Sequence, residues 1–106
     1  MDAANRMRQY QHQAIASSSP AQLVLKLYDL GILCCRRDDR SKLRAVIAEL
    51  IGSLNFEEGG EIADRLYSLY QYCLNESIDG DLTIVGEVLS GLRDAWKAGV
   101  VTRQAA

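Results

Sequence analysis

The chain contains few of the residues from which metal sites, disulfide frameworks and acid–base catalysis are built. Its 106 residues include one histidine and three cysteines. The cysteines, Cys34, Cys35 and Cys73, are odd in number and lack C-x-x-C spacing, which argues against both a disulfide framework and a zinc site. We expect them to be free, buried thiols in a reducing compartment. With His12 as the only possible imidazole base, no Ser/His/Asp or Cys/His arrangement can be assembled, so the sequence predicts no catalytic residues, no metal and no cofactor.

Net positive charge and long apolar runs are also lacking. The formal net charge is −2, and the one cluster of arginines, in RRDDR (36–40), also contains two aspartates. A nucleic-acid partner is therefore not expected. No apolar run approaches the ~18 residues that a membrane span needs, and the first residues lack the apolar core of a secretory signal. We expect a cytoplasmic protein with no membrane span.

Apolar residues at helical spacing, in contrast, run through most of the chain. Hydrophobic residues make up 48% of it, the average for globular proteins and enough for one core in a domain of this length. Repeats of three and four residues are typical of amphipathic helices, and no strand-like alternation competes with them. The stripes are Leu23, Leu27, Leu30 and Cys34; Leu43, Ile47, Leu50 and Leu54; the parallel pair Ile62, Leu66, Leu69, Cys73 and Ala63, Tyr67, Tyr70, Leu74; and Leu82, Val85, Leu89, Leu92 and Trp96.

Helix start signals divide these stripes into four helices. The first helix is expected from Pro20 after the N-cap Ser19, the second from near Ser41 after a charged break, the third after the pair Gly59–Gly60, and the fourth after the N-cap Asp81. The sequence thus predicts an all-α protein, an antiparallel four-helix bundle over residues 20–99. A flexible N-terminal arm or short helix (1–19) would precede the bundle, and a tail (100–106) would follow it.

The stretch SLNFEEGGEIADRLYSLYQY (53–72) combines carboxylates, two glycines and three tyrosines. Glu57, Glu58, Glu61 and Asp64 could in principle bind a cation or supply an acid–base pair. No histidine accompanies them, however, and the ligand series of a calcium loop is absent. A turn explains the same residues, because glycine ends one helix and carboxylates favour the first turn of the next. We interpret the stretch as a turn between helices.

The tyrosines of the third helix allow two interpretations. Tyr67, Tyr70 and Tyr72 can pack in the core with their hydroxyls at its rim. They can also line a groove for an incoming amphipathic helix, since the double stripe is broader than one neighbour covers. Trp96 is likewise either a plug at the end of the bundle or a binding anchor.

Three segments, taken in order, resemble a known family. SPAQLVLKLYD (19–29), SLNFEEGGEIADRLYSLYQY (53–72) and LRDAWK (92–97) are similar to the flagellar secretion chaperone FliS, the cytosolic chaperone of flagellin. The second motif is long and specific, and the resemblance extends from Tyr10 to about Ala98. It implies an antiparallel helical bundle that binds the disordered C-terminal segment of flagellin in apolar grooves between helices, which prevents premature polymerisation before secretion.

The resemblance also assigns expected roles to individual residues. We expect flagellin as the partner, with the flagellar export apparatus or a co-chaperone as further candidates. The arm carries apolar residues that are expected to cap the groove until flagellin displaces them. Two alternatives remain open, a small helical adaptor of the motility system and a homo-oligomeric structural bundle. The predicted client-binding residues are Tyr28, Leu66, Tyr67, Tyr70, Leu74 and Trp96, and the predicted capping residues are Met7, Tyr10 and Ile15.

Overall fold

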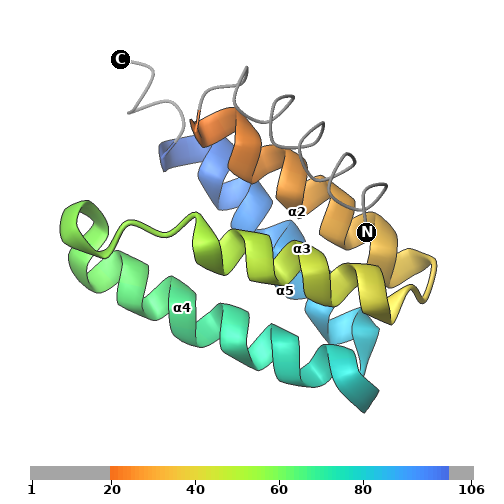
Figure 1. The fold of residues 1–106 in the computed structure, drawn as a ribbon. Coiled ribbons are helices and arrows are strands. Elements are labelled where there is room, and N and C mark those ends of the chain that lie inside the picture. The colour runs from red at the N-terminus through yellow and green to blue at the C-terminus, as the bar shows by residue number, and fades with distance from the viewer. Residues whose placement is uncertain (1–19, 101–106) are drawn as a thin grey trace, which may run out of the picture.

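The computed structural model describes residues 20–100, with only the backbone given for Pro20 and Val100. This part of the chain forms four α-helices and a closing π-helical turn, and successive helices lie antiparallel (Figure 1). It contains no strand, which confirms the predicted all-α bundle. The predicted arm and the tail from residue 101 lie outside the described residues. The elements are α2 (Pro20–Arg36), α3 (Arg40–Gly52), α4 (Phe56–Asp79), α5 (Leu82–Ala95) and the π-helical turn η1 (Trp96–Val100).

Short polar side chains cap the starts of α3, α4 and α5. Asp39, Asn55 and Asp81 each accept a hydrogen bond from a backbone N–H group two or three residues further on. These N–H groups have no partner within their own helix, so each cap satisfies donors that would otherwise be left open. The cap at Asp81 confirms its prediction. None of the helices within residues 20–100 is both long and apolar enough to cross a membrane.

The third helix begins earlier than the sequence indicated. Its predicted start after the glycine pair was one turn too late, because Asn55 caps a turn that begins at Phe56. The chain does change direction at the glycines, where Gly60 has φ of 51° and ψ of −122° inside α4. A residue with a Cβ adopts such a conformation only at a cost. Glu57 and Glu58 therefore occupy the first turn, where carboxylates favour the helix dipole.

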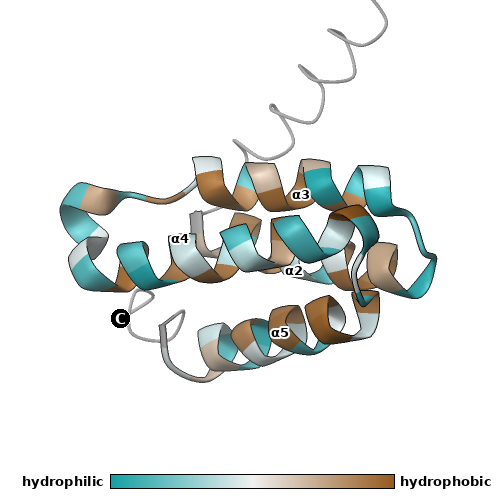
Figure 2. Ribbon diagram, turned by 90° about the horizontal axis from the view of Figure 1, so that it is seen from below, coloured by the Kyte–Doolittle hydropathy of each residue, from teal (hydrophilic) through white to brown (hydrophobic). Residues whose placement is uncertain are grey.

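Residues of all four α-helices form the core. Leu43, Ile47 and Leu50 of α3 and Val85 and Leu89 of α5 have no solvent-exposed surface. Figure 2 shows hydrophobic residues gathered on the inner sides of the helices. Burying a large aliphatic side chain contributes roughly 1.5–3 kcal/mol, so these residues are the main source of the bundle's stability.

Gly31 lies buried where α2, α3 and α5 meet. A Cβ atom added there would be 2.8 Å from Leu89 Cδ1 and 3.5 Å from Val46 Cγ1. We expect Gly31→Ala to lower the free energy of unfolding by about 1 kcal/mol in urea titrations, because overpacking a full core (about 1–3 kcal/mol) outweighs the gain in helix propensity (about 1 kcal/mol). Gly91→Ala is the control, since nothing lies within 4 Å of that position in α5. It should be stabilising, and a stabilising Gly31→Ala would contradict the tight contact.

Candidate functional site

Helices α4 and α5 are the least closely packed neighbours in the bundle. α4 packs extensively on α3, and α5 packs on α2, but the contact between α4 and α5 is small. The two helices are joined by a tight turn at Gly80, and α5 lies apart from α4 at the end away from this turn (Figure 2). The side chains between them therefore decide whether an apolar surface is left open.

Ile62 and Leu69 lie on the same side of α4 as Glu76, whose Oε2 accepts a hydrogen bond from the Asp81 N–H at 3.1 Å at the start of α5. We infer that this side of α4 faces α5. Leu69 and Ile62 precede Glu76 by about two and four helical turns, and residues seven apart lie on nearly the same side of a helix. An apolar row on α4 thus runs toward the end where the helices separate.

Ile84 and Val88 project from the side of α5 that faces α4. The opposite side of α5 packs on α2, because a Cβ at Gly86 would be 3.6 Å from a side-chain atom of α2. Arg93, seven residues after Gly86, lies on the same side of α5 and also contacts α2. The Arg93 guanidinium donates to a carboxylate of α2 at 3.1 Å. Ile84 and Val88 lie about half a turn away from Gly86 around the helix, and so point away from α2.

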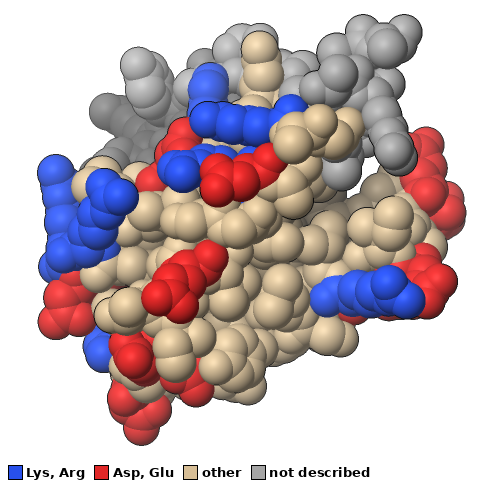
Figure 3. All heavy atoms as spheres, turned by 180° about the vertical axis from the view of Figure 1, so that it is seen from behind, with Lys and Arg blue, Asp and Glu red and all other residues tan. Residues whose placement is uncertain are grey.

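These two rows leave apolar surface exposed. Ile62 is 67% exposed and Ile84 is 38% exposed. Figure 3 shows a broad uncharged area on the face of the molecule opposite to that of Figure 1, with a hollow near one edge. An exposed apolar surface between two helices is a common site for protein binding. We name this surface the α4–α5 wedge; its walls are Ile62, Leu66 and Leu69 of α4 and Ile84, Val88 and Leu92 of α5.

Two tyrosines and the single tryptophan join three helices in the interior. The hydroxyl groups of Tyr28 in α2 and Tyr70 in α4 are hydrogen-bonded at 2.7 Å, and both side chains are buried. The ring of Trp96 packs edge-on against Tyr28, with ring centroids 6.4 Å apart. Burial raises the pKa of both phenols above the ordinary value, so the pair stays protonated and neutral across the physiological range.

The predicted client-binding residues do not form one surface. Tyr28 and Tyr70 lie in the core, where a client could reach them only if helices moved apart. Tyr67 and Leu74 lie on the other flank of α4, where Tyr67 is 40% exposed and contacts Phe56. Leu66 belongs to the wedge. The role of these residues in binding stays a prediction, and the capping residues of the arm lie outside the described part of the chain.

The wedge contains five residues that the predicted site did not include. They are Ile62, Leu69, Ile84, Val88 and Leu92. Ile62 and Leu69 were visible in the sequence as the second apolar stripe of the third helix. Ile84 and Val88 fall outside the three-and-four pattern of the fourth helix, and only the separation of α4 from α5 makes them accessible.

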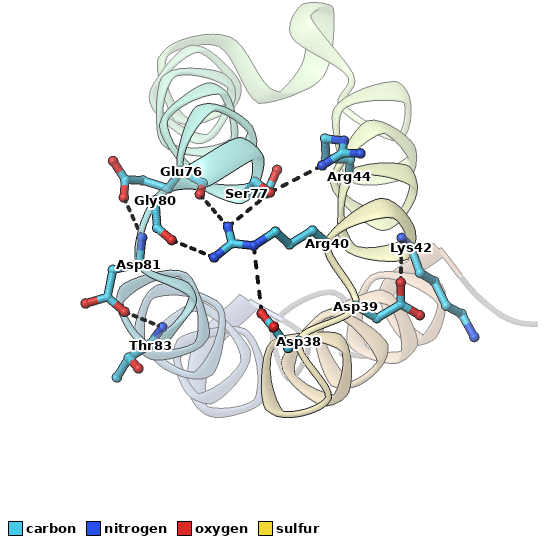
Figure 4. A network of polar contacts seen from close by, with 10 residues as sticks. All are labelled: Asp38, Asp39, Arg40, Lys42, Arg44, Glu76, Ser77, Gly80, Asp81 and Thr83. Atoms are coloured by element: carbon cyan, nitrogen blue, oxygen red, sulfur yellow. Dashed lines mark hydrogen bonds and ion pairs between the residues drawn. The ribbon is translucent and has the colours of Figure 1, made fainter.

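A network of polar contacts fixes the other end of the bundle, where α4 turns into α5 (Figure 4). The Arg40 guanidinium donates to the carbonyl oxygen of Gly80 at 2.9 Å and to those of Glu76 and Ser77 at 3.4 Å. Arg40 Nε also lies 3.8 Å from a carboxylate oxygen of Asp38. Glu76 and Ser77 belong to the last turn of α4 and Gly80 is its C-cap, where carbonyl groups lack some of their helical partners; the Glu76 carbonyl also accepts from the Gly80 N–H at 2.7 Å. Arg40 therefore ties the start of α3 to the end of α4.

A cavity of about 650 Å³ opens beside this network, between α2 and the start of α5. Its walls carry both signs of charge, including Arg36, Asp81 and Glu87, so it does not favour one class of ligand. Within residues 20–100, no group of three or more His, Cys, Asp or Glu side chains could hold a metal ion. The three cysteines are free, and burial raises the pKa of each thiol, which makes them poor nucleophiles.

These features define an all-α helical bundle with exposed apolar surface between two of its helices. A sequence model of the family described as "Flagellar protein FliS" matches residues 35–104, which include α3, α4, α5 and η1. The chain belongs to the FliS family of flagellar proteins, as its motifs predicted. This is a family of chaperones rather than enzymes, so the general role is that of a flagellar chaperone. Searches of curated proteins and of solved structures found no match.

Proposed function

We propose that this protein is a cytoplasmic export chaperone of flagellin, and that the α4–α5 wedge binds the C-terminal segment of the client. The observation that carries the proposal is the exposed apolar wedge in a bundle of the FliS family. A disordered client segment that forms an amphipathic helix would bury its apolar side between Ile62 of α4 and Ile84 of α5. Covering that side keeps flagellin from polymerising before secretion.

Ordering a disordered segment costs free energy, so the affinity must come from a large contact area with a few well-packed anchors. The wedge supplies aliphatic walls along most of the length of α5. Tyr67 and Phe56, on the other flank of α4, offer a second exposed apolar area, which a longer client segment would also cover. The arm residues Met7, Tyr10 and Ile15 are proposed to occupy the wedge until the client displaces them.

Titration calorimetry of the full chain with a synthetic peptide spanning the C-terminal segment of flagellin from the same cell tests this proposal. We expect saturable binding at or below the micromolar range with a negative heat-capacity change, which reports apolar burial. Ile84→Asp should weaken binding tenfold or more, because it places a charge on the wall of the wedge.

Leu33→Asp is the matched control for this variant. Leu33 lies on α2 and, like Ile84, is 38% exposed, so the two substitutions should lower the melting temperature by similar amounts. Leu33→Asp should leave the affinity within twofold of the wild type. Equal losses of affinity in the two variants would show that the wedge is not the binding site. No binding by the intact chain, and none after removal of residues 2–16, would reject the chaperone proposal in favour of the adaptor or the homo-oligomer.

A further inference from the structure

Two exposed carboxylates border the α4–α5 wedge at the Gly80 turn, the end that we call its closed end. Asp79 is the last residue of α4, and Glu87 lies in the second turn of α5. Within the part of the chain that the structure describes, neither of them forms an ion pair. The closed end therefore carries negative charge that no side chain in contact with it compensates.

Both carboxylates lie next to the walls of the wedge. Glu87 is three residues after Ile84 of the α5 wall. Asp79 is three residues after Glu76, on the side of α4 that we infer to face α5. Residues three apart are neighbours on the surface of a helix. The hydrogen bond from the Asp81 N–H to Glu76 Oε2 holds the two helices together here, so the closed end has one exposed carboxylate on each helix.

Basic side chains reach this end of the bundle from the other side. The Arg40 guanidinium donates to carbonyl oxygens at the end of α4, and its charge is paired with Asp38. Arg36 lines the cavity between α2 and α5, on the side of α5 that packs on α2 and not on the side of the wedge. These two cations leave the wedge side of the closed end negative.

At the wide end of the wedge, away from the Gly80 turn, the acidic side chains beside the walls already have partners. Glu61, next to Ile62, pairs with Arg65 at 2.7 Å, and Asp94 Oδ1 lies 3.5 Å from Arg93 Nε. Figure 3 shows acidic side chains gathered at the lower left, where α4 turns into α5. The two ends of the wedge thus differ in charge.

We propose that the helix bound in the wedge carries a lysine or arginine at the end that docks beside the Gly80 turn, where its charged group lies between Asp79 and Glu87. The apolar stem of such a side chain can lie along the exposed Ile84 while the cationic group stays in water. Both carboxylates would repel an acidic residue at the same place, so charge selects the partner and its register. This inference rests on the proposed function, and it adds the charge pattern of the partner.

Neutralising both carboxylates tests the proposal. In calorimetry with the same flagellin peptide, Asp79→Asn with Glu87→Gln should weaken binding about three- to tenfold, since two exposed charge contacts are lost. The matched control is Asp64→Asn with Glu49→Gln, which removes the same charges from exposed positions outside the wedge. Asp64 points about half a turn away from Ile62 on α4, and Glu49 lies on α3. The control should bind within twofold of the wild type.

A second peptide, with glutamine in place of every lysine and arginine, identifies the source of the loss. It should bind the wild-type protein about three- to tenfold more weakly than the unmodified peptide does. The double variant Asp79→Asn with Glu87→Gln should bind both peptides with similar affinity, because the change in the protein and the change in the peptide remove the same contact.

The remaining outcomes separate this inference from the proposed function. Equal affinities of the two double variants, for a peptide whose binding Ile84→Asp still weakens, overturn the role of the closed end and leave the chaperone proposal standing. A glutamine peptide that binds the wild type as tightly as the unmodified one also overturns it, as do losses that add. If the wild-type protein does not bind the unmodified peptide, both proposals are rejected.

Discussion

Raising the pH from 8 to 11 is expected to lower the free energy of unfolding by at least about 2 kcal/mol, a large part of the whole stability of a small domain. Burial raises the pKa of the Tyr28 and Tyr70 phenols above the ordinary value of 10.0, and it raises the pKa of the Cys73 thiol to about 11. These groups ionise at a lower pH in the unfolded chain than in the folded one. The stability that these groups contribute is therefore fully present below about pH 8.5. Above the unfolded pKa of each group it falls by about 1.4 kcal/mol per pH unit until the folded pKa is reached.

Urea unfolding at a series of pH values measures this dependence, and paired variants assign it to the tyrosines. The double variant Tyr28→Phe with Tyr70→Phe removes both phenols and keeps both rings. Its stability should fall less steeply than that of the wild type above pH 10. The single variant Tyr28→Phe should be less stable than the double variant at pH 7 by about 1–2 kcal/mol, because it leaves the buried Tyr70 hydroxyl without its partner. Identical alkaline slopes in the wild type and the double variant would show that the tyrosines do not control the transition.

Arg40→Met is expected to lower the free energy of unfolding by about 2–3 kcal/mol at pH 7. It removes hydrogen bonds from a charged donor to three carbonyl oxygens, two in the last turn of α4 and one at its C-cap Gly80. Such bonds contribute about 1.5–3 kcal/mol when well formed. Two of the three are long, and water can replace part of them, so the sum is smaller than three full bonds. Arg40→Lys should recover little, because an ammonium group cannot match the planar fork of the guanidinium.

Arg65→Met is the control for Arg40→Met. Arg65 forms a shorter ion pair with Glu61, at 2.7 Å, but both side chains of this pair are largely exposed. Exposed pairs contribute at most about 1 kcal/mol, so urea unfolding should detect little change. Hydrogen exchange of the last amides of α4 should accelerate in Arg40→Met and not in Arg65→Met. Equal effects of the two substitutions on the free energy of unfolding would show that the hydrogen bonds of Arg40 do not stabilise the fold more than an exposed ion pair does.

The sequence was sufficient to predict the four helices, because each carries a stripe of large apolar residues at three-and-four spacing. The N-cap at Asp81 was also predictable, since a short acidic side chain after a glycine is a local signal. The start of α4 was less predictable, because Asn55 and the glycine pair are two start signals four residues apart. The chain uses both, with a first turn from Phe56 and a bend at Gly60.

The site was harder to predict than the fold because a stripe identifies apolar residues but not the neighbour that covers them. Tyr70 and Tyr67 belong to the same stripe, yet Tyr70 is buried against Tyr28 and Tyr67 is exposed. The hydrogen bond between Tyr28 and Tyr70 joins residues 42 positions apart, for which no local pattern exists. The double stripe of α4 allowed for apolar surface that no neighbouring helix covers. How much of each flank is left exposed depends on the packing of α4 against α3 and α5, and this is a property of the whole bundle.

The extensive contact between α2 and α5 has a consequence for synthesis of the chain. In the described part of the protein these are the first and the last α-helices, and Gly31 of α2 lies against Leu89 of α5. Until Leu82–Ala95 has been translated, the apolar side of α2 lacks the neighbour on which it packs most. A nascent chain ending at the Gly80 turn therefore exposes a surface that the finished protein buries. Folding on the ribosome has to wait for the final helix, and until then the chaperone itself is a chain that aggregates easily.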